Sequence, residues 1–148
     1  MQNGLLIARF RIKYNLSQQD VANILHISLK TYKNYEANIR LIPLENLNKI
    51  SVYFNISLDC LLGLSKKNHC IKKEIDYQKL KYNLWFIRKK SHIKIKKLAC
   101  EFKITSQSII NYEKKDTPVS ITYLYNIAKK FQISVDYLCG KSTKKEIL

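Results

Sequence analysis

The stretch Ile104-Thr105-Ser106-Gln107-Ser108-Ile109-Ile110-Asn111-Tyr112-Glu113 has the pattern of a short amphipathic helix. Its large apolar side chains recur at a spacing that one helical face can bury, and its short polar side chains lie on the opposite face. Thr105 precedes the pattern and is a favourable N-cap residue. An exposed face that carries amides rather than charges suits the reading of base edges, because Gln and Asn can each bond adenine through both arms. The residues concerned are Ile104, Ile109 and Tyr112 on the apolar face and Ser106, Gln107 and Asn111 on the polar face.

The chain has a large excess of basic residues. Of its 148 residues, 27 are Lys or Arg and 11 are Asp or Glu, which gives a formal net charge of +16. Residues 1–65 hold seven basic and four acidic side chains, a net of +3, whereas residues 66–148 hold 20 and seven, a net of +13. Such a balance is the expected footprint of a protein that binds a polyanion. The second half of the chain therefore has the stronger electrostatic preference for phosphate.

The sequence consists of two copies of one unit, related by an offset of 77 residues. Sliding the chain by this offset aligns Tyr35-Glu36 with Tyr112-Glu113, and the match continues without a gap. Most matched positions are apolar or are helix-cap residues, so the two copies share a core and a set of helix ends. The matched pairs include Arg11/Arg88, Ala22/Ala99, Ile27/Ile104, Asn34/Asn111, Leu47/Leu124, Ile50/Ile127, Phe54/Phe131, Asp59/Asp136, Leu61/Leu138 and Gly63/Gly140.

Each copy reads as five short helices, and no alternating strand pattern competes with them, so the expected fold class is all-α. In the first copy the helices are expected over about 4–14, after a capping box at Ser17, from Ser28 to Glu36, over 44–54, and between Ser57 and Gly63. In the second they are expected after Asp76 and over about 95–102, 106–114, 121–131 and 134–139. The predicted domains are residues 1–65 and 76–148, joined by a basic linker over 66–75. Residues 141–148 have no core of their own and are expected to fray.

No catalytic or metal-binding constellation is visible in the sequence. The four cysteines, Cys60, Cys70, Cys100 and Cys139, form no CxxC pair, and we expect them to be small buried residues in a reducing compartment. There is no Gly-rich phosphate loop, nucleophile motif or acid pair, so we expect no enzyme activity, no cofactor and no metal. No apolar run approaches a membrane span. We therefore expect a soluble, cytoplasmic and nucleoid-associated protein with no membrane partner.

The paired motifs resemble the phage repressor and Cro (Xre-type) helix-turn-helix family, once in each copy. The first copy carries Leu16-Ser17-Gln18, Ala22, Ser28, Tyr35-Glu36 and Ser57-Leu58-Asp59-Cys60-Leu61-Leu62-Gly63. The second carries Ala99, Thr105-Ser106-Gln107, Tyr112-Glu113 and Ser134-Val135-Asp136-Tyr137-Leu138-Cys139-Gly140. The resemblance implies two tandem five-helix domains whose second helix crosses the DNA backbone and whose third helix enters the major groove. It also implies that the partner is double-stranded DNA and that the protein regulates transcription, most simply as a repressor.

The resemblance also assigns roles to individual residues. The family's base-reading positions fall on Leu29, Lys30 and Asn34 in the first copy and on Ser106, Gln107 and Asn111 in the second. The phosphate position at the start of the second helix falls on Gln18, but its counterpart Ile95 does not match. Lys94, Lys96 and Lys97 surround Ile95, and lysines at a helix N-terminus favour an anion while they weaken the helix. Further candidates for phosphate contact are Arg40, Lys114 and Lys115.

Two departures from the family pattern concern the turn and the first recognition helix. Where the family commonly has Gly between its second and third helices, this chain has His26 and Lys103. We expect both to adopt the left-handed conformation at a cost of about 1 kcal/mol. Leu29 and Tyr32 make the first recognition helix more apolar than the second. Either Leu29 reads a thymine methyl group, or this helix has turned toward a protein contact.

Three questions stay open at the level of sequence. Singly, Gln107 or Asn111 would be an ordinary solvated amide, and only their joint placement makes them candidates. The two copies could act as a covalent pseudo-dimer on half-sites about 34 Å apart, or the chain could form a homodimer in which only the second copy reads DNA. The alternative function is an antitoxin or phage-type inhibitor in which one copy, domain 1, binds a protein partner. Trp85 is expected on the exposed side of its helix.

Overall fold

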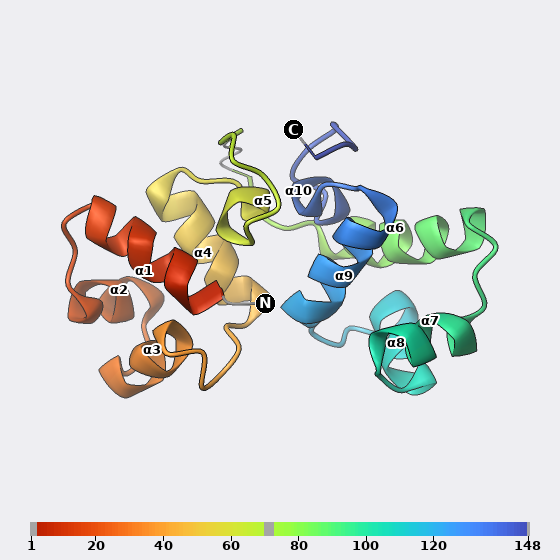
Figure 1. Ribbon diagram of the computed structural model, residues 1–148, viewed down its shortest axis with the longest axis horizontal. Helices are drawn as coiled ribbons and strands as arrows, with labels where there is room; N and C mark the ends of the chain where they lie inside the picture. The colour runs from red at the N-terminus through yellow and green to blue at the C-terminus, as the bar shows by residue number, and fades with distance from the viewer. Residues whose placement is uncertain (1–2, 70–72, 148) are drawn as a thin grey trace. The chain divides into compact units, whose positions relative to one another are not determined.

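The computed structural model describes residues 3–69 and 73–147, and these residues form ten α-helices and one isolated β-bridge. The helices fall into two compact units that divide between Lys73 and Glu74 (Figure 1). The all-α fold class predicted from the periodicity is confirmed. Each unit is described below by itself.

The first unit contains α1 (Asn3–Lys13), α2 (Gln18–Leu25), α3 (Leu29–Glu36), α4 (Leu44–Phe54) and α5 (Leu58–Leu61). The side chains of Ser17, Ser28 and Ser57 cap α2, α3 and α5, as their positions in the sequence predict. At Ser17 the cap is reciprocal. The Asp20 carboxylate accepts from the Ser17 backbone N–H at 2.7 Å, and Ser17 Oγ accepts from the Asp20 N–H at 3.1 Å.

The second unit contains α6 (Tyr77–Lys90), α7 (Ile95–Phe102), α8 (Ser106–Lys114), α9 (Ile121–Phe131) and α10 (Val135–Leu138). The side chains of Asp76 and Thr105 cap α6 and α8. Lys94 occupies the N-cap position of α7 and makes no side-chain cap bond. The bounds of α7, α8 and α9 coincide with those predicted from the sequence.

The repeat extends to the backbone conformation. Four pairs of residues 77 positions apart have left-handed backbone angles in both units, and three of these pairs contain no glycine: Asn15/His92, His26/Lys103, Asn55/Gln132 and Gly63/Gly140. The predicted left-handed turn residues, His26 and Lys103, have φ of 55° and 54°. Asn38 breaks the rule, because it has φ of 56° while its counterpart Lys115 is extended at −112°. The loop that follows the third helix therefore differs between the units.

The apolar positions matched by the repeat form the core of each unit. Leu44, Leu47, Ile50 and Phe54 are buried along one face of α4, as their spacing predicts. In the second unit Leu84, Leu98, Ile109, Leu124 and Leu138 are fully buried and bring α6 to α10 together. Within each unit the third helix packs against the first two: α3 lies on α1 and α2, and α8 lies on α6 and α7.

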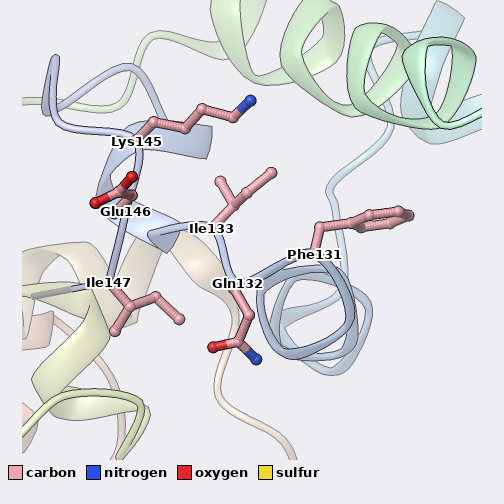
Figure 2. A pocket seen from close by; sticks show the side chains of 6 residues that line it. All are labelled: Phe131, Gln132, Ile133, Lys145, Glu146 and Ile147. Carbon is pink, nitrogen blue, oxygen red and sulfur yellow. The ribbon is translucent and has the colours of Figure 1, made fainter.

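The C-terminal tail is ordered, so the prediction that residues 141–148 fray is wrong as far as Ile147. Ser134 donates its backbone N–H to the Lys145 carbonyl at 2.8 Å, and Ile133 and Glu146 form the isolated bridge. Figure 2 shows the tail facing the end of α9 across a pocket lined by Phe131, Gln132, Ile133, Lys145, Glu146 and Ile147. The tail is held because it supplies hydrogen bonds that the connector between α9 and α10 lacks.

The first unit uses the start of the predicted linker in the same way. Asn68, the counterpart of Lys145, accepts from the Ser57 backbone N–H at 2.9 Å and donates to the Asn55 carbonyl at 2.7 Å. The Cys60 thiol donates to the Lys67 carbonyl. Lys67 and Asn68, which the sequence placed in the linker, thus belong structurally to the first unit.

The cysteines divide by burial. Cys60 and Cys139 are buried, as expected, but Cys100 is exposed on α7, so the expectation is wrong for that residue. Its counterpart in the first unit, Asn23, is also exposed, because this position of the second helix faces outward in both units. Cys70 lies outside the described residues.

Candidate nucleic-acid interface

The amide-bearing face of α8 is open to solvent. Gln107 is exposed, Ser106 and Asn111 are half-buried, and Ile109 on the opposite face is fully buried. Gln107 Nε2 donates to Asn111 Oδ1 at 2.9 Å, one helical turn away. This bond uses one N–H of Gln107 and one lone pair of Asn111. The oxygen of Gln107 can still accept a hydrogen bond and its second N–H can still donate one, and both N–H groups of Asn111 can donate. The pair can therefore both donate to and accept from a base edge.

The N-terminal end of α7, the second helix of this unit, is basic and has no side-chain cap. Lys94, Lys96 and Lys97 are exposed around the first turn of α7, whose N-cap makes no side-chain bond. The equivalent turn of α2 has the Ser17–Asp20 capping box instead. Lysines oppose the helix dipole at this position, and the missing cap leaves backbone N–H groups to be satisfied by another acceptor. A phosphate would satisfy both requirements.

The C-terminal end of α8 is also basic. Lys114 and Lys115 are exposed where α8 ends, and Lys103 is exposed in the turn that precedes it. The nearby acidic groups are engaged elsewhere: Asp116 pairs with Lys81 at 2.6 Å and Glu101 pairs with Lys130 at 2.6 Å. Exposed lysines therefore lie at both ends of α8, with Lys103 before its first turn and Lys114 and Lys115 at its last.

In the first unit α3 presents a more mixed surface. Lys30 is exposed, and Leu29 and Asn34 are half-buried on the outward face. Arg40 is exposed in the loop after α3. The same loop exposes Ile39 and Leu41 to 75% and 53%, where the second unit has Asp116 and Pro118. The two recognition helices thus differ in chemistry although they occupy equivalent places.

Gln18 has a structural partner as well as its predicted role at phosphate. Its Nε2 donates to Glu36 Oε2 at 2.7 Å, and the side chain is half-buried. Tyr32 donates its hydroxyl to the same carboxylate at 2.7 Å. In the second unit both donors are replaced together, by Ile95 and Ile109. The mismatch at Ile95 therefore belongs to a paired change, in which two side chains that donate to the glutamate are replaced by two apolar side chains.

A buried ion pair braces each recognition helix against the first helix of its unit. Arg11 bonds Glu36 through Nε at 2.6 Å, and Arg88 bonds Glu113 through Nε and Nη2 at 2.6 and 2.7 Å. The second pair is the more buried, with side chains 7% and 1% exposed. Sequence reasoning matched the arginines and the glutamates across the repeat but did not pair them. The same sequence separation between the arginine and the glutamate in both copies was the signal that could have predicted this ion pair.

The two ion pairs shift the pKa values of Glu36 and Arg88 in the direction that favours their charged forms. Burial is the largest influence on Glu36 and works to raise its pKa. The hydrogen bonds from Arg11, Gln18 and Tyr32 together outweigh burial and hold this pKa below the ordinary 4.5. In the second unit the hydrogen bond to Glu113 raises the pKa of Arg88. The Arg11–Glu36 pair is therefore charged at neutral pH, and the bidentate geometry of both pairs fixes the orientation of α3 and α8.

Aromatic packing supports the same end of α8. The Tyr112 ring lies against Tyr123, with centroids 5.0 Å apart, and Phe102 meets Tyr123 edge-on at 5.9 Å. Tyr123 is buried, and burial raises the pKa of its hydroxyl. Of the two pairs of aromatic residues matched by the repeat, Tyr35 and Phe54 are buried in the first unit, and Tyr112 and Phe131 are half-buried in the second. Within the described part of the chain, no helix is both long and apolar enough to cross a bilayer.

Comparison with known proteins identifies the family. A model of the helix-turn-helix family matches the chain twice, at residues 7–59 and 86–138, one match in each unit. The comparisons with curated proteins and with solved structures found no match. Members of the family are DNA-binding regulators and are not normally enzymes. The two matches cover more than half of the sequence, so this chain belongs to the helix-turn-helix family of Xre or lambda-repressor type, in two tandem copies.

Proposed function

We propose that the protein is a sequence-specific transcriptional regulator, most simply a repressor that occludes a promoter, and that α8 reads base edges in the major groove. The observation that carries the proposal is the Gln107–Asn111 amide pair on the solvent-facing side of α8, in a unit that also exposes lysines at the N-terminus of α7 and at both ends of α8. Amides specify the sequence, whereas lysines bind phosphate and position the helix. Such a regulator acts on chromosomal DNA, so we place it at the nucleoid in the cytoplasm.

The two units have different roles in this proposal. Ser106, Gln107 and Asn111 read bases in the second unit, and Lys94, Lys96, Lys97, Lys114 and Lys115 hold the phosphates on either side. In the first unit Leu29, Lys30 and Asn34 read bases, and Gln18 and Arg40 contact phosphate. Because lysines are denser around α8, the second unit contributes most of the salt-dependent affinity. The first unit extends the site that is read.

The connection between the units limits how they share a site. Asn68 is anchored on the first unit, and Asp76 is anchored on the second by its N–H bond to the Cys139 carbonyl at 2.9 Å. The eight peptide steps between these anchors span at most about 27 Å when extended. We propose a covalent pseudo-dimer on adjacent turns of one duplex. Light scattering measures the oligomeric state, and footprinting measures the length of DNA that is protected. A monomer that protects two half-sites would support the pseudo-dimer. A dimer in which only the two second units protect DNA would contradict it.

The proposal is tested by selecting bound duplexes from a random DNA pool with the full chain. We expect a defined consensus, and we expect the logarithm of the binding constant to fall with the logarithm of salt by roughly 0.9 per phosphate neutralised. The triple variant Lys94→Gln/Lys96→Gln/Lys97→Gln should reduce this slope by about 2 to 3. A salt slope without any consensus would show phosphate binding alone and would contradict base readout.

A second candidate function follows from the loop after α3. Ile39 and Leu41 are strongly exposed beside the recognition helix, and exposed apolar side chains are a feature of protein-binding surfaces. They favour an antitoxin or phage-type inhibitor in which domain 1 holds a protein. A partner complex that survives high salt and is lost in Ile39→Asp would support this function. DNA binding of the proposed kind does not survive high salt.

A further inference from the structure

An aromatic face lies on the solvent side of α6, and nothing in the DNA-binding site uses it. Tyr82, Trp85 and Phe86 are 56%, 37% and 36% exposed. They lie on the opposite side of the helix from Leu80 and Leu84, which are fully buried in the core. Exposed clusters of this kind are rare on monomeric proteins and mark interaction sites.

The three rings form one continuous surface rather than separate platforms. Tyr82 stacks on Phe86 with centroids 5.7 Å apart and planes 17° apart, and Trp85 lies 5.9 Å from Tyr82. Ring faces that are already stacked on one another are less available to intercalate or stack on bases. A shared apolar surface of this kind suits packing against the side chains of a protein.

The fold does not require these rings. The repeat places Ala8 and Arg9 of α1 at the positions of Trp85 and Phe86, and α1 forms the same helix of the first unit. Arg9 is exposed like Phe86, so a charged side chain is compatible with this position. Trp85 and Phe86 are therefore additional to what the helix needs in order to pack.

The charged residues around the rings indicate what kind of partner this face binds. Lys79, Lys89 and Lys90 are exposed beside the rings, Lys90 Nζ lies 6.0 Å from the Phe86 centroid, and α6 contains no acidic residue. A second copy of this face would bring lysines against lysines, and like charges at close range oppose association. A partner with apolar side chains and a carboxylate rim would satisfy both the rings and the lysines.

We propose that the aromatic face of α6 docks an acidic amphipathic helix of a partner protein. The three rings lie at positions i, i+3 and i+4 along about one turn of α6, which matches the spacing of anchors on such a helix. Because the rings and the core-facing side of α6, which holds Arg88 against α8, lie on opposite sides of the helix, DNA and the partner can be bound together. This surface gives a DNA-bound regulator a contact to a second protein, and it does not depend on which bases α8 reads.

Trp85 is the sole tryptophan of the chain, so its fluorescence reports on this face in the full-length protein. The probe is a synthetic helical peptide of about 18 residues with Leu on one face and Glu along its edges. We expect a saturable blue shift of the Trp85 emission, because docking removes the ring from water. The same peptide with Lys in place of Glu should give no shift.

Variants separate docking from folding. Phe86→Arg installs the residue of the first unit, keeps Trp85 as the reporter, and should weaken peptide binding at least about tenfold. The double variant Lys89→Glu/Lys90→Glu should shift the preference toward the Lys peptide. Tyr53→Ala removes another aromatic side chain, 55% exposed on the first unit, and should change nothing. Helix content by circular dichroism confirms that each variant is folded.

Several results would overturn the proposal. An absent shift, or equal shifts with the Glu and Lys peptides, would exclude an acidic partner. A blue shift that grows with protein concentration alone would identify a second copy of the chain as the occupant. A shift at lower concentrations of an anionic vesicle or a single-stranded oligonucleotide than of the Glu peptide would assign the face to lipid or to nucleic acid.

Discussion

The Arg–Glu brace places a pair of opposite charges where each unit joins its recognition helix to its first helix. Arg88 and Glu113 are almost completely buried, whereas Arg11 and Glu36 retain some contact with water. A buried charge that loses its partner is costly because the remaining charge is desolvated without compensation. The two copies therefore offer the same interaction at two depths of burial.

Replacing Glu113 by Gln should lower the free energy of unfolding of the second unit by about 3 kcal/mol, since Arg88 would stay buried without a counter-charge. The apolar double variant Arg88→Met/Glu113→Leu should recover most of this loss, because it buries no charge. Urea denaturation measures both. A loss below about 1 kcal/mol for Glu113→Gln would contradict the brace as described.

The first-unit brace predicts a pH dependence. The pKa of Glu36 is lower in the folded chain than its ordinary 4.5, so its stabilising effect is fully present above pH 4.5 and is lost as pH falls through the folded value. The urea midpoint of the wild type should therefore fall more steeply between pH 5 and pH 3 than that of Glu36→Gln. Parallel curves for the two proteins would show that the carboxylate has no such role. Comparing the two proteins cancels the contribution of the other acidic residues.

At the scale of the element, α7 trades stability for charge at its N-terminus. Lys94→Ser would supply the side-chain cap that α2 has, and should stabilise the second unit by about 1 kcal/mol. The same change removes one candidate phosphate contact and should reduce the salt slope of DNA binding by about 0.9. Thermal unfolding and salt titration check the two effects separately. A variant that is more stable and binds DNA with an unchanged slope would remove Lys94 from the interface.

The helix ends at Gly63 and Gly140 make a second matched pair. Both have left-handed φ, of 71° and 70°, but a Cβ at Gly140 would lie 2.8 Å from Asp76 Cβ, whereas one at Gly63 would lie 3.1 Å from the tip of Leu6. Gly63→Ala should cost about 1 kcal/mol in left-handed strain, and Gly140→Ala should cost at least about 1 kcal/mol more. Urea midpoints of the two variants, compared with the wild type, test this order. Equal costs would show that the end of α10 yields to the added methyl group.

Sequence predicted the elements well because their signals are local. Ser17, Ser28, Asp76 and Thr105 cap the helices that follow them, since a cap depends on residues three positions away. The hydrogen bond between the C-terminal tail and the backbone of Ser134 could not be predicted, because the Ser134 N–H becomes accessible to the tail only when the connector between α9 and α10 is folded. The pairing of Arg88 with Glu113 was missed for the same reason.

At the scale of the whole molecule, the repeat explains both what is shared and what differs. The shared positions are core, caps and left-handed turns, and these could be predicted from the offset of 77 residues. Several differing positions lie on outward faces: Lys30 against Gln107 and Arg9 against Phe86 are exposed, and Leu29 against Ser106 is half-buried. Their roles could not be fixed from packing, because solvent-facing positions are constrained by partners rather than by the fold.

Under the proposed function, the difference between the units predicts an order in which they bind DNA. With the denser lysines around α8, the second unit would associate first with any duplex, and the first unit would then engage an adjoining turn. Replacing Lys30 and Arg40 by Gln should therefore weaken binding to the selected site and shorten the footprint, while nonspecific binding changes little. Footprinting at fixed salt measures this. An unchanged footprint would show that the first unit does not bind DNA and would favour its binding to a protein partner.

The central claim is that α8 reads bases through Gln107. The direct test is the affinity of wild type and Gln107→Ala for the selected duplex and for every single-base-pair change in it, at one salt concentration. Gln19→Ala is the matched control, because Gln19 forms the same i, i+4 amide bond with Asn23 on α2 at 2.8 Å. We predict a loss of about 1–3 kcal/mol for Gln107→Ala that vanishes when one particular base pair is changed. A loss that is the same for every duplex, or no loss at all, would contradict the account.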